Sequence, residues 1–65
     1  MIEKSKIEKF ENKFVKIWFK DSLQGKHCLV GIIKKINEID LIFDINNENY
    51  LILLKFENIQ YILFK

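Results

Sequence analysis

The clearest secondary-structure signal in the chain lies in residues 13–20, which read KFVKIWFK. Alternate positions there form one apolar row and one row with two lysines around a tryptophan. The apolar row is Val15, Ile17 and Phe19, and the other row is Lys16, Trp18 and Lys20. A period of two is typical of a β-strand with one buried and one exposed face. We therefore predict a half-buried strand whose apolar row faces a core.

Four further strands are predicted downstream of this one. They cover residues 27–37, 40–45, 50–56 and 59–64, and are joined by a loop at 21–26, a polar turn at 46–49 and a tight connection at 57–58. Gly25 is the expected turn residue of the loop. Gly31 interrupts the second strand, and a glycine inside a strand is typical of a bulge or a sharp bend. Residues 51–54 form an uncharged, β-prone run, for which we expect Lys55 to act as a gatekeeper.

A short helix is predicted before the first strand. Ser5 and Glu8 have the spacing of a capping box, in which each side chain bonds to the backbone of the other residue. Ile7 and Phe10 then fall on one face of a helix that covers about residues 5–11. A helix of two turns is unstable alone in water, so it has to pack against the strands.

One helix and five short strands predict an all-β fold. We expect a single domain over residues 1–65, with a five-stranded antiparallel barrel from about residue 13 onward. Closing the sheet would cover its apolar face and remove its free edges. Ile7 and Phe10 are expected to seat the helix over one end of the barrel. The predicted interior residues are Val15, Ile17, Phe19, Ile33, Ile36, Leu41, Phe43, Ile45, Phe56 and Ile59.

Length and composition exclude several classes of protein. A chain of 65 residues forms one small domain at most. One cysteine and one histidine cannot supply a disulfide framework or the four ligands of a structural zinc site. No apolar run approaches the length of a membrane span, and no signal peptide opens the chain. We expect a soluble, cytoplasmic protein.

The sequence offers no set of catalytic residues. His27 and Cys28 are neighbours and would point to opposite faces of a strand. Asp40 and Asp44 lie on one strand, roughly 13 Å apart, which is too far for a paired carboxylate mechanism. A glycine-rich phosphate loop is also missing. We therefore predict a binding module that is not an enzyme, with no catalytic residue, cofactor, metal or small-molecule substrate, and with no membrane contact.

The charge distribution indicates where such a module could bind. Residues 1–35 hold nine lysines and four acidic residues, whereas residues 36–65 hold two lysines and five acidic residues. A tryptophan between two lysines can stack on a base while the lysines meet phosphates. The candidate contacts for protein or RNA are Lys16, Trp18, Lys20, Lys26, Lys34 and Lys35. The alternatives are that the helix covers Trp18 or that Trp18 closes one end of the barrel, that the lysines are merely solvated, and that a barrel mixes the charges of the two halves.

The order of several short motifs resembles a known family. The motifs are Phe10-Glu11-Asn12, Val15-Lys16-Ile17, Gly25-Lys26, Leu29-Val30-Gly31 and Asn58-Ile59-Gln60. Together they resemble the C-terminal SH3-like domain of the bacterial ribosome maturation factor RimP. Asn12 stands where that family has a glycine, and asparagine is the best substitute at a positive φ. The resemblance covers nearly the whole chain from about Ile2.

The resemblance implies an SH3-like barrel and a role in ribosome assembly. That family assists assembly of the small ribosomal subunit by binding a ribosomal protein, rRNA or both, and has no catalytic residues. On this basis we expect a monomer. The family also has an N-terminal α/β domain and a Ser-Pro-Gly linker, and neither is found in this sequence. Met1 falls where the linker would end. We therefore expect either an excised domain or a chain whose start codon lies at the domain boundary.

Two other binding modules fit the same pattern. The first is an Sm-like RNA-binding barrel, which works as a homo-oligomeric ring paired through its fourth and fifth strands. Against it stand the loop at 21–26, which is long for that class, and the lack of an evident uridine-binding asparagine motif near Gly31. The second is a generic SH3-like module for proline-rich peptides, which needs clustered aromatic residues. Trp18, Tyr50 and Tyr61 are scattered in the sequence.

Overall fold

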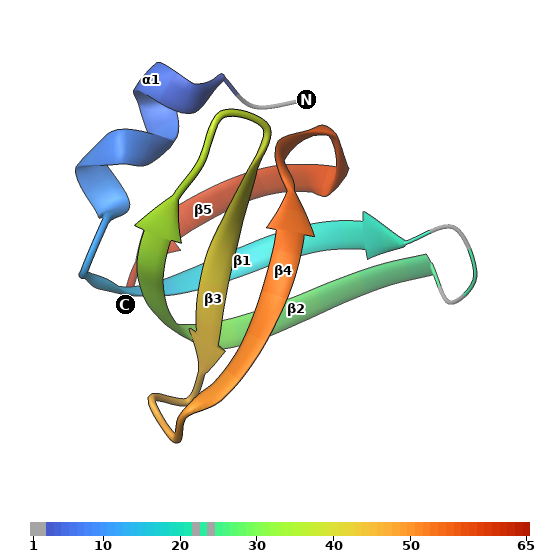
Figure 1. The fold of residues 1–65 in the computed structure, drawn as a ribbon. Coiled ribbons are helices and arrows are strands. Elements are labelled where there is room, and N and C mark those ends of the chain that lie inside the picture. Colours follow the sequence, from blue (N-terminus) through green and yellow to red (C-terminus); the bar gives the residue numbers. More distant parts are fainter. Residues whose placement is uncertain (1–2, 22, 24) are drawn as a thin grey trace.

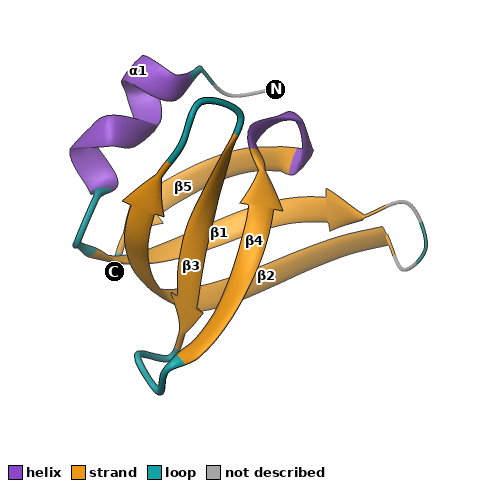
Figure 2. Cartoon of the chain, in the orientation of Figure 1, coloured by secondary structure: helices purple, strands orange, loops and turns teal. Residues whose placement is uncertain are grey.

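The computed structural model describes residues 3–21, 23 and 25–65 of the chain. These residues form a short helix, two 3-10 helices and five strands (Figures 1 and 2). In chain order the elements are α1 (Lys4–Ile7), η1 (Glu8–Phe10), β1 (Phe14–Asp21), β2 (Gly25–Ile36), β3 (Asp40–Ile45), β4 (Tyr50–Lys55), η2 (Phe56–Asn58) and β5 (Ile59–Phe64). All strand pairs are antiparallel, in the order β4-β3-β2-β1-β5. The predicted all-β class and its five antiparallel strands are confirmed.

The sheet bends over on itself without closing, so the predicted closed barrel is wrong. Figure 1 shows β3 and β4 crossing in front of β1 and β5, with β2 shared by both layers. The chain turns at η2, after which β5 pairs with β1 instead of returning along β4. The strands on the two sides of η2, β4 and β5, do not pair with each other and lie at opposite ends of the strand order. Each of them therefore keeps one free edge.

The core lies between the two layers and includes side chains from most elements. The buried apolar residues are Ile7, Phe10, Val15, Ile17, Phe19, Ile33, Leu41, Phe43, Leu54, Phe56, Ile59 and Ile62. Ile36 and Ile45, predicted inside, are only half-buried and pack against this cluster from its margin. Leu54 and Ile62 were not among the predicted core residues. They face inward because they pair with buried Leu41 and Ile17.

The N-terminal segment is shorter and starts earlier than the predicted helix. Its N-cap is Glu3, whose carbonyl accepts a hydrogen bond from the Lys6 N–H at 3.0 Å, and no side chain caps the helix. The capping box is therefore wrong, since Ser5 lies inside α1. The chain then tightens into η1, which brings Phe10 into the core behind Ile7. Burial of these two apolar residues, and not the cap, determines where the helix lies.

Asn12 has the positive φ, 63°, that the sequence predicts. Its N–H donates to the carbonyl oxygen of Ile33 at 2.7 Å. This bond ties the end of the helical segment to the middle of β2.

In the described part of the chain, no helix is long and apolar enough to cross a membrane.

Gly31 marks a close approach of backbones, and of the two predicted irregularities at this residue, a bulge or a bend, the bulge is wrong. It pairs with Val15 on one side and Ile45 on the other, in regular register. A Cβ atom built on it would lie 2.9 Å from the carbonyl carbon of Asp44, closer than real contacts allow. The irregularity of β2 lies further on, between Ile33 and Lys35.

The connection between the first two strands is shorter than the predicted loop at 21–26. The ladder continues through Lys20–Lys26 and Asp21–Gly25, so β1 ends at Asp21 and β2 begins at Gly25. Gly25 has φ 86°, as its predicted turn role requires. The long loop, which argued against an Sm-like barrel, is therefore not present.

Candidate nucleic-acid interface

Trp18 lies on the outer face of β1 and is not covered by α1. Because Val15, Ile17 and Phe19 face the core, the alternate positions of β1 face outward. Trp18 is half-buried, and its cross-strand neighbours are Cys28 on β2 and Tyr61 on β5. Its burial comes from neighbours on the outer face and not from the core.

A stack of two aromatic rings and one ammonium group forms the centre of this outer face. The rings of Trp18 and Tyr61 are 4.5 Å apart between centroids, with an angle of 22° between their planes. The Nζ atom of Lys16 lies 5.0 Å from the centroid of the Trp18 ring. Tyr61 remains half exposed, so part of this stack is open to a flat ligand. A nucleobase can extend such a stack whatever its sequence, because every base has a π face.

Two further lysines stand beside the stack. Lys20 and Lys26 are direct cross-strand partners on β1 and β2, and both are exposed. Neither has a salt bridge within the described residues. Like charges directly opposite each other destabilise a sheet, and a bound phosphate would relieve this repulsion. We call Lys16, Trp18, Lys20, Lys26 and Tyr61 the aromatic–lysine face.

The other two candidate lysines lie elsewhere on the sheet. The Nζ of Lys34 is 4.0 Å from Oδ2 of Asp44, at the irregularity of β2. Lys35 pairs with Ile42 of β3, on the far side of the bent sheet from β5. The structure therefore brings together four of the six candidates, and leaves Lys34 and Lys35 outside the aromatic–lysine face.

Tyr61 is the residue of the aromatic–lysine face that sequence reasoning missed. The aromatic residues appeared scattered, yet Trp18 and Tyr61 are directly stacked, while Tyr50 lies on β4. The sequence does indicate that Tyr61 faces outward on the last strand. This alone could not place Tyr61 beside Trp18, because the sequence does not show that the last strand pairs with the first.

Asp44 is a second unexpected feature, since it is a fully buried carboxylate. Its Oδ1 atom accepts a hydrogen bond from the Tyr50 N–H at 3.1 Å, which closes the β3–β4 hairpin. Its Oδ2 atom is buried and has no hydrogen-bond partner among the described residues. A buried carboxylate oxygen without a hydrogen bond is costly, and the ammonium group of Lys34, 4.0 Å from Oδ2, offsets part of this cost.

We expect Asp44→Ala to lower the free energy of unfolding by about 1–3 kcal/mol, because it leaves the Tyr50 N–H without its acceptor. Asp44→Asn keeps an acceptor at the Oδ1 position and should lose clearly less. Urea unfolding followed by circular dichroism measures both changes. Equal losses in the two variants would contradict the role of the Tyr50 hydrogen bond.

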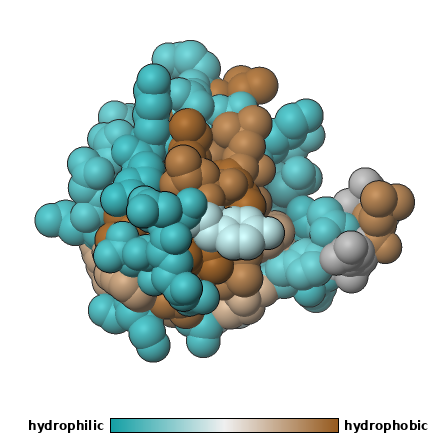
Figure 3. Space-filling model, turned by 60° about the horizontal axis from the view of Figure 1, so that its bottom comes forward, coloured by the Kyte–Doolittle hydropathy of each residue, from teal (hydrophilic) through white to brown (hydrophobic). Residues whose placement is uncertain are grey.

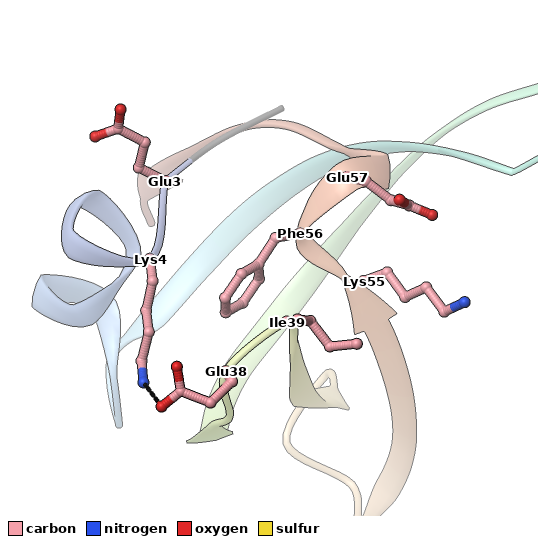
Figure 4. A pocket seen from close by; sticks show the side chains of 7 residues that line it. All are labelled: Glu3, Lys4, Glu38, Ile39, Lys55, Phe56 and Glu57. Atoms are coloured by element: carbon pink, nitrogen blue, oxygen red, sulfur yellow. Dashed lines mark hydrogen bonds and ion pairs between the residues drawn. The ribbon is translucent and has the colours of Figure 1, made fainter.

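A shallow hollow of about 330 Å³ lies between α1, the β2–β3 turn and η2. Figure 4 shows Phe56 pointing into this space, while Glu3 and Glu57 point away from it. Lys4 and Glu38 close one side through a contact of 2.9 Å between Nζ and Oε1. This hydrogen bond raises the pKa of Lys4 above its ordinary value. The hollow holds paired charges and no convergent reactive groups among the described residues.

Comparison of the chain with models of protein families, with curated proteins and with solved structures found no match. The resemblance to RimP therefore stays a prediction from the motifs. Within the described residues, no group of three or more His, Cys, Asp or Glu side chains could hold a metal ion.

Proposed function

We propose that this chain is a non-catalytic, cytoplasmic binding domain that contacts RNA through its aromatic–lysine face. Its target is the immature small ribosomal subunit, where it acts as a ribosome maturation factor domain. The observation that carries the proposal is the stack of Trp18 and Tyr61, with Lys16 over it and the exposed pair of Lys20 and Lys26 beside it.

The chemistry of the face favours RNA over an acidic protein. A carboxylate ligand would need the lysines alone, whereas stacked rings with an open face also suit a nucleobase. Lysines on the same face can meet the phosphates on either side of that base. The motifs that resemble RimP direct the proposal to ribosomal RNA.

We expect Trp18→Ala to weaken RNA binding by about 1–3 kcal/mol, the range for the loss of one base-stacking contact. Tyr61→Phe is the matched control, because it keeps the ring and removes only the hydroxyl group. Fluorescence anisotropy with a labelled single-stranded oligouridine measures the affinity. Lys20→Ala should weaken binding less than Trp18→Ala and lower the slope of log Kd against log salt by about one.

Thermal unfolding of the same variants separates a contact from a core position. Trp18 packs on the outer face, so its loss should leave a cooperative transition near that of the wild type. A Trp18→Ala protein that unfolds tens of degrees early, or that binds RNA as tightly as the wild type, would refute the role proposed for the face.

Co-sedimentation with small ribosomal subunits tests the cellular target. We expect association at low salt that falls steeply as salt rises, because phosphate contacts release counterions. Large subunits at the same concentration are the control. No association at low salt, or equal association with both subunits, would contradict the ribosome-assembly role.

An Sm-like RNA-binding barrel is the second candidate, and the short β1–β2 connection favours it. The Sm-like candidate would bind short single-stranded RNA by itself, whereas the maturation factor would bind RNA as part of the small ribosomal subunit. Short single-stranded RNA that displaces the domain from small subunits at stoichiometric amounts would favour the Sm-like candidate. Small subunits that retain the domain against such RNA would favour the maturation factor.

A further inference from the structure

Gln60 is the extra residue of a β-bulge in β5, because it has no partner on β1. Tyr61 pairs with Trp18, while the next residue of β1 pairs with Ile59. Ile59 and Ile62 are both buried, whereas the two residues between them are exposed. A regular strand would turn one of those two side chains towards the core. The bulge therefore places Gln60 on the outer face of the sheet, next to Tyr61.

The side-chain amide of Gln60 is exposed and has no hydrogen bond to the described residues. An amide carries an N–H donor and a C=O acceptor side by side. The aromatic–lysine face otherwise offers ring surfaces, a phenol hydroxyl group and ammonium donors. Bulges are over-represented next to functional sites, where they re-aim a side chain. Gln60 thus adds to this face a group that can distinguish one planar ligand from another.

The open aromatic surface of the stack belongs to Tyr61. The Trp18 ring is stacked on Tyr61, and the ammonium group of Lys16 also lies over the indole. Because β5 is the last strand in the sheet order, no strand flanks Tyr61 on the side away from Trp18. Tyr61 accordingly stays 50% exposed. A flat ligand finds its stacking surface on Tyr61, and Trp18 holds that ring in place.

We propose that Tyr61 and Gln60 form a site for one unpaired adenine of the bound RNA. The inference rests on the proposed function and adds to it the base that is read. The ring of Tyr61 stacks on the base, the amide of Gln60 bonds to the edge of the base, and the pair of Lys20 and Lys26 meets the phosphate. One open ring, one free amide and one lysine pair accommodate a single nucleotide.

The pattern of donors and acceptors on the base favours adenine. Its amino group lies beside the N7 acceptor on one edge and beside the N1 acceptor on the other. The amide of Gln60 can therefore form two hydrogen bonds with either edge. Guanine offers two acceptors and no donor on the edge that carries N7. The pyrimidines present a smaller ring to Tyr61, so they stack over less area.

The lysine pair lies on the same side of the stack as Gln60. Lys20 is two residues beyond Trp18 on β1, roughly 7 Å along the strand, a distance that a nucleotide spans between base and phosphate. The antiparallel pairing sets residues before Tyr61 beside residues after Trp18. Figure 3 shows the end of the β1–β2 hairpin projecting from the molecule, with hydrophilic side chains where it leaves the apolar body. A phosphate can approach this end without meeting that apolar body.

Fluorescence anisotropy with oligouridines that differ at one central position tests the site. A single adenosine there should lower Kd by about fivefold or more, the lower end of the range for two hydrogen bonds to a base edge. Purine riboside keeps both rings but lacks the amino group, so it should lose most of this gain. A second adenosine beside the first should add little, because the site takes one base.

Variants of Gln60 show which side chain reads the base. Gln60→Ala should bind the adenosine and purine riboside oligonucleotides with nearly equal affinity. Gln60→Glu has acceptors only when ionised, so its preference should move from adenine to cytosine, whose amino group is a donor. Lys20→Ala is the matched control, because a phosphate contact does not read sequence. It should weaken binding of every oligonucleotide by the same factor.

The outcomes separate the adenine site from the proposed function. Equal affinity for the oligonucleotides with and without adenosine would overturn the adenine site and leave RNA binding in place. An adenine preference that survives in Gln60→Ala or Gln60→Glu would overturn the role of Gln60. No affinity for any of the oligonucleotides would refute the proposed function, and the adenine site with it.

Discussion

Gly31→Ala is expected to abolish cooperative folding of this domain. The added Cβ would meet the Asp44 backbone across the β2–β3 ladder and lie 3.0 Å from Cζ of Phe43. Neither neighbour can move freely, because one is strand backbone and the other is fully buried. Overpacking typically costs about 1–3 kcal/mol and occasionally more, and a contact with strand backbone, which cannot rotate away, belongs at the upper end of that range. A domain of this size has only about 3–10 kcal/mol of stability in total.

Gly25→Ala is the control for the glycine at position 31. No atom lies within 4 Å of a Cβ built on Gly25, so only its positive φ opposes the substitution. That strain costs roughly 1–2 kcal/mol. Urea unfolding should give a cooperative transition for Gly25→Ala and none for Gly31→Ala. Similar midpoints for the two variants would show that β3 can move away from Gly31.

Phe43→Ala is expected to lower the free energy of unfolding by about 3–5 kcal/mol, the usual cost of removing a buried aromatic ring. Phe43 is fully buried, and its pairing with Ile33 and Ile52 places it where the layers of the sheet meet. The cavity would therefore open between the layers and could not be filled by a small local shift.

Phe14→Ala is the matched control, since Phe14 is 41% exposed on the outer face of β1. Its loss should cost no more than about 1 kcal/mol. Phe43→Leu should fall between the two, because it keeps most of the apolar volume. Denaturant unfolding of all three variants measures the order. A Phe43→Ala protein as stable as Phe14→Ala would place the core elsewhere.

Features that depend on neighbouring residues could be predicted from the sequence. The alternation around Ile17 identifies the inner and outer faces of β1, and Asn12 takes the left-handed conformation expected of it. Both follow from local rules of strand geometry and turn chemistry. The face that carries Trp18 was predicted for the same reason.

Features that depend on distant residues could not be predicted. The position of Tyr61 beside Trp18 requires the pairing of the first and last strands, for which the sequence carries no local signal. Asp44 fits the outward row of an alternating strand, yet the hairpin that follows it buries its carboxylate. The capping box at Ser5 had the right spacing, but core packing of Ile7 determined the helix start.

The strand order also bears on how the domain folds during synthesis. The pairings β1–β2, β2–β3 and β3–β4 join neighbours in the chain and can form as soon as each hairpin leaves the ribosome. The pairing of β5 with β1 closes a loop of nearly the whole domain and has to form last. Until then, β1 keeps an unpaired edge and the inner face lacks Ile59 and Ile62. The final step of folding therefore waits until β5 has left the ribosome, and the nascent chain is most exposed to misassociation immediately before β5 emerges.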